Sequence, residues 1–476
     1  MILTKTDTFL HHFIIDFPNI DPNNIKIAAF DLDSTIIKTK SKKVMPESKD
    51  DWLFFANLNN MKRIFKLLVK KGFLIVVFSN QKNLEKRISI EDFQYKINSI
   101  NSELKLNISW MFALEDDLYR KPMLGMFKYY TDLIKLYYDA FNTNIKFCLK
   151  ESFYCGDAAG RVYNSKLKSK DHSYIDMYFA HNAGIRFITP EKLFLSDSAN
   201  YQIVHPYQNI NLKKIFGPKL TISSSVTKTN SSSSETETNS SSSETETNTS
   251  SSETETNTSS SVTETSSPDT NSDTTLYDVL NLINTFINNT INKVGKKICI
   301  IMVGCPGSGK STIRQKIINL PIINSDIFTF SPDDKTSVKN YKSKINKSNI
   351  IIDSTNSSFK HRAKYYEELD PTIYNFLIIH FNIDKLLCKH LNHCRYHKTL
   401  FLETSEISVT SEISEISEVL VPEIAYRIYY KNYEDPNLDY SKLDDNYQLK
   451  VININNIKSI IDPSMITNEY YMMYNI

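Results

Sequence analysis

The sequence predicts two α/β domains with mainly parallel sheets, joined by a low-complexity segment. Short runs rich in β-branched or aromatic residues alternate with longer mixed stretches, which is typical of parallel α/β sheets. A length of 476 residues also suits two or three domains. Ligands of such sheets bind at the carboxyl ends of the strands. The expected strands are Ile25–Phe30, Phe73–Phe78, Ser152–Cys155, Ile298–Val303, Ile350–Ile352 and Phe376–His380, and Leu58–Lys71 is an expected helix.

Residues 221–275 consist almost entirely of Ser, Thr, Glu and Asn. They contain too few apolar side chains to offset the entropy of ordering, so we predict a disordered linker between domains at 1–220 and 276–476. Residues 222–273 hold nine acids and one base, a net of −8, in a chain of net charge +2. The rest of the chain therefore carries a net charge of +10. This charge favours a polyanionic partner only weakly, because it is spread over two domains. A Ser/Glu/Ile repeat at 403–418 is interpreted as a surface insertion.

Composition excludes several classes of protein. Six cysteines in so long a chain do not form a dense disulfide framework. No run reaches the roughly 18 apolar residues of a membrane helix, and the N-terminus lacks the apolar core of a signal peptide. We therefore expect a soluble intracellular protein without a membrane partner, in the nucleus or the cytoplasm.

Acidic and polar residues follow three of the predicted N-terminal strands. Asp31 and Asp33 come directly after the first, Ser79 ends the second, and Asp157 follows Ser152–Cys155. Lys121 adds a cation shortly before Gly125. One carboxylate can attack phosphorus while the other moves protons, and Mg²⁺ offsets their repulsion. Asp pairs after strands are also common turn formers, so this pattern alone leaves both interpretations open.

A phosphate-binding motif follows the strand predicted at Ile298–Val303. It matches G-x-x-x-x-G-K-[ST] in the strand-then-helix context that the motif requires. Its glycines allow backbone N–H groups to surround phosphate oxygens. We expect ATP here, with Lys310 on the phosphates and Ser311 on Mg²⁺; a glycine-rich turn without nucleotide is the alternative. The motif comprises Gly304, Cys305, Pro306, Gly307, Ser308, Gly309, Lys310, Ser311 and Thr312.

The N-terminal motifs resemble those of the haloacid dehalogenase superfamily, with its Rossmann-like sheet. Further strings resemble the 3′-phosphatase domain of eukaryotic-type polynucleotide kinase/3′-phosphatases: Arg120–Met126, Gly156–Arg161, Asp171–Ser173, Asp176, Phe179-Ala180, Asn182 and Thr189–Glu191. The resemblance implies Asp31 as nucleophile, Asp33 as general acid/base, and Ser79 and Lys121 on the phosphate. It also implies a magnesium site at Asp31, Asp33 and Asp157. Asp171 and Asp176 are left open, and we favour an exposed helix cap for Asp176.

The C-terminal half resembles the kinase domain of the same family. The matching positions are Ile351–Asn356, Arg362, Tyr365, His390, Asn392, Arg395, Val421-Pro422 and Tyr426-Arg427. The resemblance implies Asp326 as the base for a 5′-hydroxyl, Arg395 as a lid arginine, and Asp353 near the metal or nucleotide. Ser325, Ser354 and Ser357 stand where the family usually has Arg, Asn and Pro. A zinc site is not favoured, because helical spacing spreads its candidate ligands over several faces: Cys388, His390, His393, Cys394 and His397.

We therefore predict a bifunctional end-healing enzyme of DNA strand-break repair. It would hydrolyse 3′-phosphates and transfer the ATP γ-phosphate to 5′-hydroxyl ends, with Mg²⁺ at both sites. DNA is favoured over RNA as the polymer, and we expect a monomer that works with a DNA ligase or other repair proteins. The alternatives are a 3′-phosphatase with a weakened nucleotide-binding kinase domain, and a small-molecule phosphatase fused to a metabolite kinase.

Overall fold

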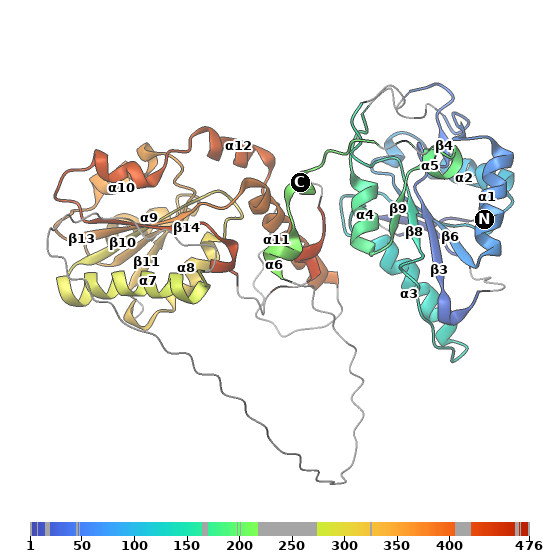
Figure 1. Ribbon diagram of the computed structural model, residues 1–476. Coiled ribbons are helices and arrows are strands. Elements are labelled where there is room, and N and C mark those ends of the chain that lie inside the picture. Colours follow the sequence, from blue (N-terminus) through green and yellow to red (C-terminus); the bar gives the residue numbers. More distant parts are fainter. Residues whose placement is uncertain are drawn as a thin grey trace, which may run out of the picture.

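The computed structural model shows two lobes side by side, each built on its own sheet (Figure 1). The predicted linker and the repeat at 403–418 fall almost entirely outside the described residues. The structure describes residues 2–6, 8–14, 20–43, 46, 48–163, 170–197, 199, 201–217, 274–323, 326–404, 420–461, 466 and 468–474.

The N-terminal lobe contains a seven-stranded sheet in the order β1-β2-β7-β6-β3-β8-β9. The five strands from β7 to β9 are parallel, and β1 and β2 extend that edge in antiparallel pairing. A short antiparallel pair, β4 (Ile37–Lys38) with β5 (Leu53–Phe54), follows the first motif. The sheet strands are β1 (Thr4–Lys5), β2 (Phe9–His12), β3 (Lys26–Phe30), β6 (Phe73–Asn80), β7 (Ser109–Ala113), β8 (Phe153–Cys155) and β9 (Arg186–Ile188).

Helices cover both faces of this sheet. Alternate residues of β3 point to opposite faces, so Phe30 packs with Phe65 on one side and Ala29 packs with Tyr130 on the other. The first face is covered by α1 (Leu58–Lys70), α2 (Ile90–Leu104) and α5 (Pro190–Phe194), and the second by α3 (Gly125–Asp139) and α4 (Ile175–Ala183).

The C-terminal lobe contains a five-stranded parallel sheet in the order β11-β12-β10-β13-β14. Its strands are β10 (Lys297–Gly304), β11 (Ile327–Phe330), β12 (Asn349–Ile352), β13 (Tyr374–Phe381) and β14 (Leu449–Ile454). The helices are α7 (Leu276–Asn288), α8 (Lys310–Ile318), α9 (Lys335–Lys344), α10 (Phe359–Glu368), α11 (Lys385–Thr404) and α12 (Glu423–Lys431). Helices α7 and α8 pack on one face, and α9 and α10 pack on the other. The six predicted strands and the predicted helix are confirmed. The strands follow from the sequence because short, continuous apolar runs suit parallel strands that are buried on both faces.

The two lobes meet through a segment that follows the N-terminal sheet. Tyr207 and Phe216 are buried in the same apolar cluster as residues of the C-terminal lobe. Phe216 lies in α6 (Leu212–Phe216), which Figure 1 shows between the lobes beside α11. Residues 206–216, which we assigned to the N-terminal domain, thus contribute their apolar side chains to the core of the other lobe.

Hydrogen bonds join the same interface. Asn182 of α4 exchanges two hydrogen bonds with Met473, at 2.9 and 2.7 Å. The Tyr207 hydroxyl lies 2.8 Å from Nδ1 of His390 on α11. A cavity of about 550 Å³ opens beside these contacts, lined by α4, residues 208–213 and residues 471–473.

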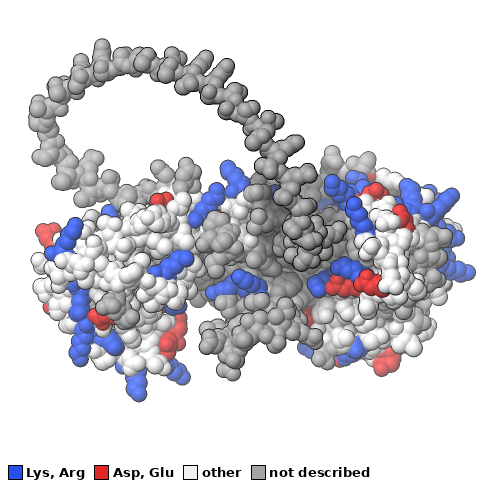
Figure 2. Space-filling view, turned by 90° about the horizontal axis from the view of Figure 1, so that it is seen from below, with Lys and Arg blue, Asp and Glu red and all other residues white. Residues whose placement is uncertain are grey.

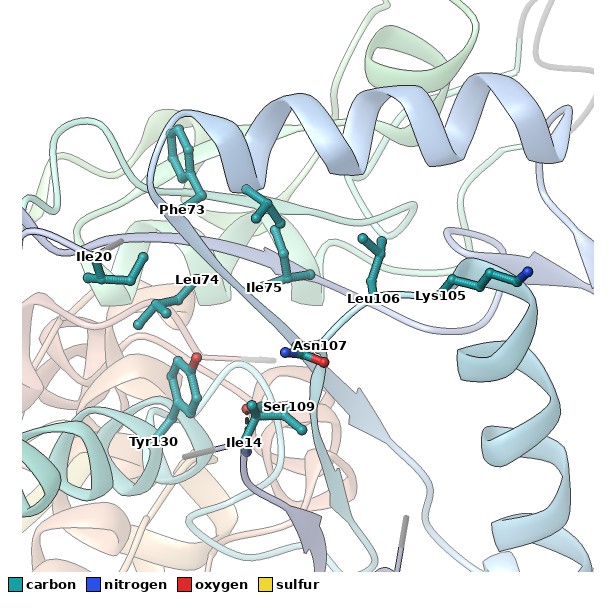
Figure 3. A pocket seen from close by; sticks show the side chains of 11 residues that line it. Ile14, Ile20, Phe73, Leu74, Ile75, Lys105, Leu106, Asn107, Ser109 and Tyr130 are labelled. Atoms are coloured by element: carbon teal, nitrogen blue, oxygen red, sulfur yellow. Dashed lines mark hydrogen bonds between the residues drawn. The ribbon is translucent and has the colours of Figure 1, made fainter. Parts of the chain in front are cut away.

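A second cavity lies at the amino ends of the strands in the N-terminal lobe (Figure 3). It encloses about 240 Å³ and is lined by the start of β6, the start of β7 and Tyr130 of α3. Because the candidate catalytic residues follow the carboxyl ends of the strands, this cavity lies at the opposite edge of the sheet.

Charged side chains are mixed on the surface. On the face shown in Figure 2, Lys and Arg are spread over both lobes, with Asp and Glu among them. Within the described residues, none of the helices is both long and apolar enough to cross a membrane.

Candidate active sites

In the N-terminal lobe, the predicted residues converge at the carboxyl ends of three neighbouring strands. Asp31 follows β3, Ser79 lies at the end of β6, and Asp157 comes two residues after β8. Lys121 reaches the same place from the loop between β7 and α3. The order β6-β3-β8 places Asp31 between the other two strand ends, which is the arrangement the parallel sheet predicted.

Lys121 is the centre of a buried charge cluster. Its Nζ lies 2.9 Å from Asp31 Oδ1 and 2.7 Å from Asp176 Oδ1, and it contacts the Tyr154 hydroxyl at 2.5 Å. Burial lowers the pKa of Lys121, but the carboxylates of Asp176 and Asp31 outweigh it and leave the pKa raised. Lys121 is therefore a fixed cation beside Asp31.

The backbone around Lys121 is held by neighbouring amides. Asn80 accepts a hydrogen bond from Lys121 N at 2.8 Å and donates one to Lys121 O at 3.1 Å. Asn182 donates to the Pro122 carbonyl at 3.0 Å. The Lys121–Pro122 peptide bond is cis. Three side-chain hydrogen bonds thus fix the loop that presents the ammonium group.

Three carboxylates in this site form a candidate metal centre. Ligand oxygens of Asp31, Asp157 and Asp176 all lie within 4.8 Å of one another. Burial raises the pKa of Asp31 to about 6, and burial together with Asp176 and Asp31 raises the pKa of Asp157 well above its usual value. Crowded acidic oxygens of this kind suit a hard cation such as Mg²⁺.

The structure corrects our expectation for Asp176. Asp176 is 2% exposed and is bound by Lys121 and by Ala158 N, so it is not the exposed helix cap that we favoured. Its position three and four residues before the buried Phe179 and Ala180 places it on the inner face of α4, a pattern visible in the sequence. Gly156 permits this approach, because a Cβ there would lie 2.4 Å from Asp176 Oδ2.

Asp33, which we predicted as a metal ligand, lies outside the cluster. Its Oδ2 accepts a hydrogen bond of 2.7 Å from Gln81, and its Oδ1 lies 3.9 Å from Lys96 Nζ. Among the described residues, the group of potential metal ligands consists of Asp31, Asp157 and Asp176, without Asp33. Gln81 also contacts Ser79 Oγ at 3.2 Å, so Asp33 and Ser79 are tied to one amide group.

Asp171 organises the loop that carries Asp157. It accepts hydrogen bonds from Ala159 N and Arg161 N, and from Arg161 Nε at 2.8 Å. Arg161 also donates to Glu191. Asp171 therefore shapes the loop and lies outside the three-carboxylate group.

In the C-terminal lobe, the predicted phosphate-binding loop joins β10 to α8. Gly307 and Gly309 adopt φ of +76° and +92°, a region that favours glycine. A Cβ on Gly307 would lie 2.2 Å from the Cys388 carbonyl oxygen, so the loop packs closely against the start of α11. Lys310 Nζ donates to Gly304 O and Cys305 O, each at 2.8 Å. Ser311 and Thr312 follow in the first turn of α8.

Residues after β12 support this loop. Asp353 forms an ion pair with Arg314 of α8. The side chain of Asn356 donates to Met302 O at 2.8 Å, and Gly304 N donates to Thr355 O. Arg362 is fully buried and binds both oxygens of Asp439, so its guanidinium group belongs to a structural ion pair.

Helix α11 lies against the phosphate-binding loop. Arg395 is exposed on this helix and contacts Asn392 Oδ1 at 3.3 Å. Its charge lowers the pKa of Lys310, together with the larger effect of burial, so the two cations lie within electrostatic range. Of the residues considered for a zinc site, Cys394 Sγ lies 3.4 Å from His390 Nε2, and the rings of His393 and His397 stack. Among described residues, the one group of three or more potential metal ligands is Asp31, Asp157 and Asp176.

Asp326 does not join this site. It immediately precedes β11, and β11 is parallel to β12 with Ile327 opposite Asn349. Asp326 therefore lies at the amino edge of the sheet, whereas the phosphate-binding loop and Asp353 lie at the carboxyl edge. The base role predicted for Asp326 is not supported by this placement. Ser325 lies outside the described residues.

The acidic residues at the carboxyl end of β11 are Asp333 and Asp334. Asp334 caps α9 by accepting a hydrogen bond from Thr336 N. Asp333 is exposed beside it, at the same edge as Asp353. The base role of Asp326 was implied by the family resemblance alone, and it stays a prediction.

Comparison with known proteins matches a family and several relatives. Residues 26–194 match the family described as polynucleotide kinase 3 phosphatase. An uncharacterized 20.8 kDa protein of Autographa californica nuclear polyhedrosis virus is 36% identical over 173 residues, covering 36% of this chain and 87% of that protein. A protein of Acanthamoeba polyphaga mimivirus, named as a candidate bifunctional polynucleotide phosphatase/kinase, is 28% identical over 459 residues, covering 91% and 87% of the two chains. A bifunctional polynucleotide phosphatase/kinase of Schizosaccharomyces pombe is 36% identical over 187 residues, covering 38% and 41%.

Proposed function

Because this chain belongs to the polynucleotide kinase/3′-phosphatase family, we propose that it heals nucleic-acid ends at two separate sites. It is a bifunctional enzyme that hydrolyses 3′-phosphates and phosphorylates 5′-hydroxyl ends with ATP. The N-terminal lobe is the phosphatase and the C-terminal lobe is the kinase.

The observation that carries the phosphatase assignment is the buried cluster around Lys121. An ammonium held between Asp31 and Asp176 leaves Asp31 as a carboxylate that can attack phosphorus. Lys121 and Ser79 bind the phosphoryl oxygens. Mg²⁺ held by Asp31, Asp157 and Asp176 would offset the repulsion between these acids and the phosphate.

Asp33 moves the protons of the reaction. As Asp31 attacks, the bond between phosphorus and the 3′-oxygen breaks, and the leaving oxygen takes the proton of Asp33. Asp33 then takes a proton from the water that attacks the aspartyl phosphate, which regenerates Asp31 and releases inorganic phosphate.

The kinase site is assembled around the phosphate-binding loop. Lys310 binds the phosphates of ATP, Ser311 would hold Mg²⁺, and Arg395 stabilises charge on the transferred phosphoryl group. Asp353 pairs with Arg314 of α8, the helix that follows the loop. Asp333, in place of Asp326, takes the proton from the 5′-hydroxyl, since it lies at the carboxyl edge of the sheet.

A nicked duplex with 5′-hydroxyl and 3′-phosphate ends tests both activities. Incubation with Mg²⁺ and labelled ATP is expected to label the 5′ end and to release inorganic phosphate. Normal phosphate release without label transfer would reject the kinase and favour a weakened nucleotide-binding domain. Hydrolysis of small phosphate esters alone would reject the nucleic-acid substrate.

We also propose DNA strand-break repair as the setting, with a DNA ligase acting on the product. The reaction leaves a 3′-hydroxyl and a 5′-phosphate, which are the ends that a ligase joins. The same assay on matched DNA and RNA duplexes is expected to favour DNA. A higher kcat/KM on RNA would assign the enzyme to RNA ends instead.

A further inference from the structure

Helix α2 carries a lysine on its buried face. Lys96 is 3% exposed and lies on the same face as the buried Phe93, Ile97 and Ile100. Helical periodicity places an apolar residue at this position, and lysine is almost never fully buried without a charged partner. The burial of Lys96 therefore requires an explanation.

The partner of Lys96 is the proton-transfer residue of the phosphatase site. Its Nζ lies 3.9 Å from Asp33 Oδ1, while Gln81 Nε2 holds Asp33 Oδ2 at 2.7 Å. The two oxygens of Asp33 are thus held from two directions, by residues that are 3% and 4% exposed. This arrangement fixes the orientation of the carboxyl group relative to Ser79, which contacts the same Gln81 amide.

Stability does not explain the pair. The side chain of Asp33 is 47% exposed, and ion pairs with a solvent-exposed partner contribute little to folding. Burial of the ammonium, in contrast, is unfavourable. A lysine that is unfavourable for folding and directed at a catalytic acid indicates a role in the reaction.

We propose that Lys96 is a positioning residue for proton transfer by Asp33. Lys96 Nζ and Gln81 Nε2 contact the two oxygens of Asp33 from different directions. They thereby hold the carboxyl group in the orientation that delivers its proton to the leaving 3′-oxygen, which departs poorly without that proton. This inference rests on the proposed phosphatase function and adds a residue to the same site.

Leaving-group dependence tests this role. The Lys96→Met variant is compared with the wild type on an oligonucleotide 3′-phosphate and on p-nitrophenyl phosphate, whose phenolate departs without a proton. In the first turnover, before water attacks the aspartyl phosphate, we expect release of the oligonucleotide to slow by roughly 10- to 100-fold and release of p-nitrophenolate to change by less than about threefold. Lys96→Arg should restore part of the oligonucleotide rate. Equal losses on both substrates, or no loss on the oligonucleotide, would overturn the proposal.

Two controls separate this effect from misfolding. Lys66→Met replaces an exposed lysine of α1 and should leave both rates unchanged. Because Lys96→Met removes a buried charge, its melting temperature should not fall, and its kinase rate should equal that of the wild type. A lower melting temperature with equal losses of both activities would assign Lys96 a structural role.

A double-mutant cycle gives the second measurement. Asp33→Asn should show the same pattern of first-turnover rates, and adding Lys96→Met to it should cause little further loss on the oligonucleotide. Additive losses would show that Lys96 acts independently of Asp33. If the wild type itself does not hydrolyse the oligonucleotide, the proposed substrate is rejected. The ratio of variant to wild-type rates on another alkyl phosphate would then decide the role of Lys96.

Discussion

The two active sites differ in how far their charges are placed before a substrate binds. In the N-terminal lobe, Lys121, Asp31 and Asp176 are connected by contacts of 2.7 to 2.9 Å and are largely buried. In the C-terminal lobe, Arg395 and Asp333 are exposed on separate elements, and Lys310 contacts the carbonyls of its own loop.

This difference fits the two reactions. Hydrolysis takes one organic substrate and water, so a fixed set of charges can be complementary to its transition state in advance. Phosphoryl transfer between ATP and a polynucleotide end brings two large substrates together. A lid whose charged groups become ordered as the substrates bind suits that reaction. Substitutions in the first site should therefore disturb a fixed arrangement of charges, and those in the second should disturb the assembly of the site around its two substrates.

The largest expected effect comes from removing one central residue from each site. Asp31→Ala should reduce phosphate release by about 10⁴-fold or more and leave the kinase rate unchanged, because it removes the nucleophile. Lys310→Ala should do the reverse, since it removes the cation on the ATP phosphates. Both rates are measured on the nicked duplex, and loss of both activities in a variant with a normal melting curve would contradict two independent sites.

The next effect distinguishes the two edges of the C-terminal sheet. Asp333→Ala should lower the kinase rate by roughly 10²- to 10³-fold, because it removes the proposed base. Asp326→Ala is the matched control and should retain the wild-type rate, since it lies at the opposite edge. Steady-state 5′-labelling of an oligonucleotide measures both, and the reverse result would restore Asp326 as the base.

A smaller effect is expected from the glycine that admits Asp176 to the metal cluster. Gly156→Ala places a Cβ about 2.4 Å from Asp176 Oδ2, so the carboxylate must move. Phosphate release should fall by roughly 10²-fold, with a higher Mg²⁺ concentration needed for half-maximal rate. Titration of Mg²⁺ checks this, and the kinase rate of the same variant provides the control. An unchanged Mg²⁺ dependence would mean that Asp176 is not a ligand.

The smallest effect concerns the interface between the lobes. Burial lowers the pKa of His390 and His393 to about 4 and that of His397 to about 3, from an ordinary value of 6.5. In the folded state these imidazoles stay neutral down to about pH 4, whereas in the unfolded state they bind protons below about pH 6.5. The unfolded state therefore binds more protons in this pH range. Stability is complete above pH 6.5 and decreases as the pH falls towards 4.

A thermal melt at pH 7 and pH 5 measures this loss. We expect a decrease of about 5 °C in Tm, and a smaller decrease in a His397→Phe variant. His397 stacks on Tyr474 with an interplanar angle of 2°, so an aromatic replacement keeps the contact and removes the titration. An equal pH dependence in both proteins would exclude these histidines as its source.

Much of the fold and of both sites follows from the sequence. Continuous apolar runs such as Ile298–Val303 identify buried parallel strands, and polar residues directly after them identify the functional edge. The phosphate-binding loop and the residues Asp31, Ser79 and Asp157 follow from these local patterns, because each lies within a few residues of a strand end. Lys121 lies in the longer loop between β7 and α3, and the family resemblance identified it.

The tertiary structure decided what local patterns do not contain. Asp176 and Lys96 lie on helices, and only the packing of α4 and α2 against the sheet brings them to Asp31 and Asp33. The edge on which Asp326 and Asp333 lie depends on the register of β11 against β12. The lobes are joined by contacts between residues far apart in the sequence, such as Tyr207 with His390, which are 183 residues apart. The sequence by itself determined which residues carry the chemistry at strand ends; long-range packing determined which other charges surround them.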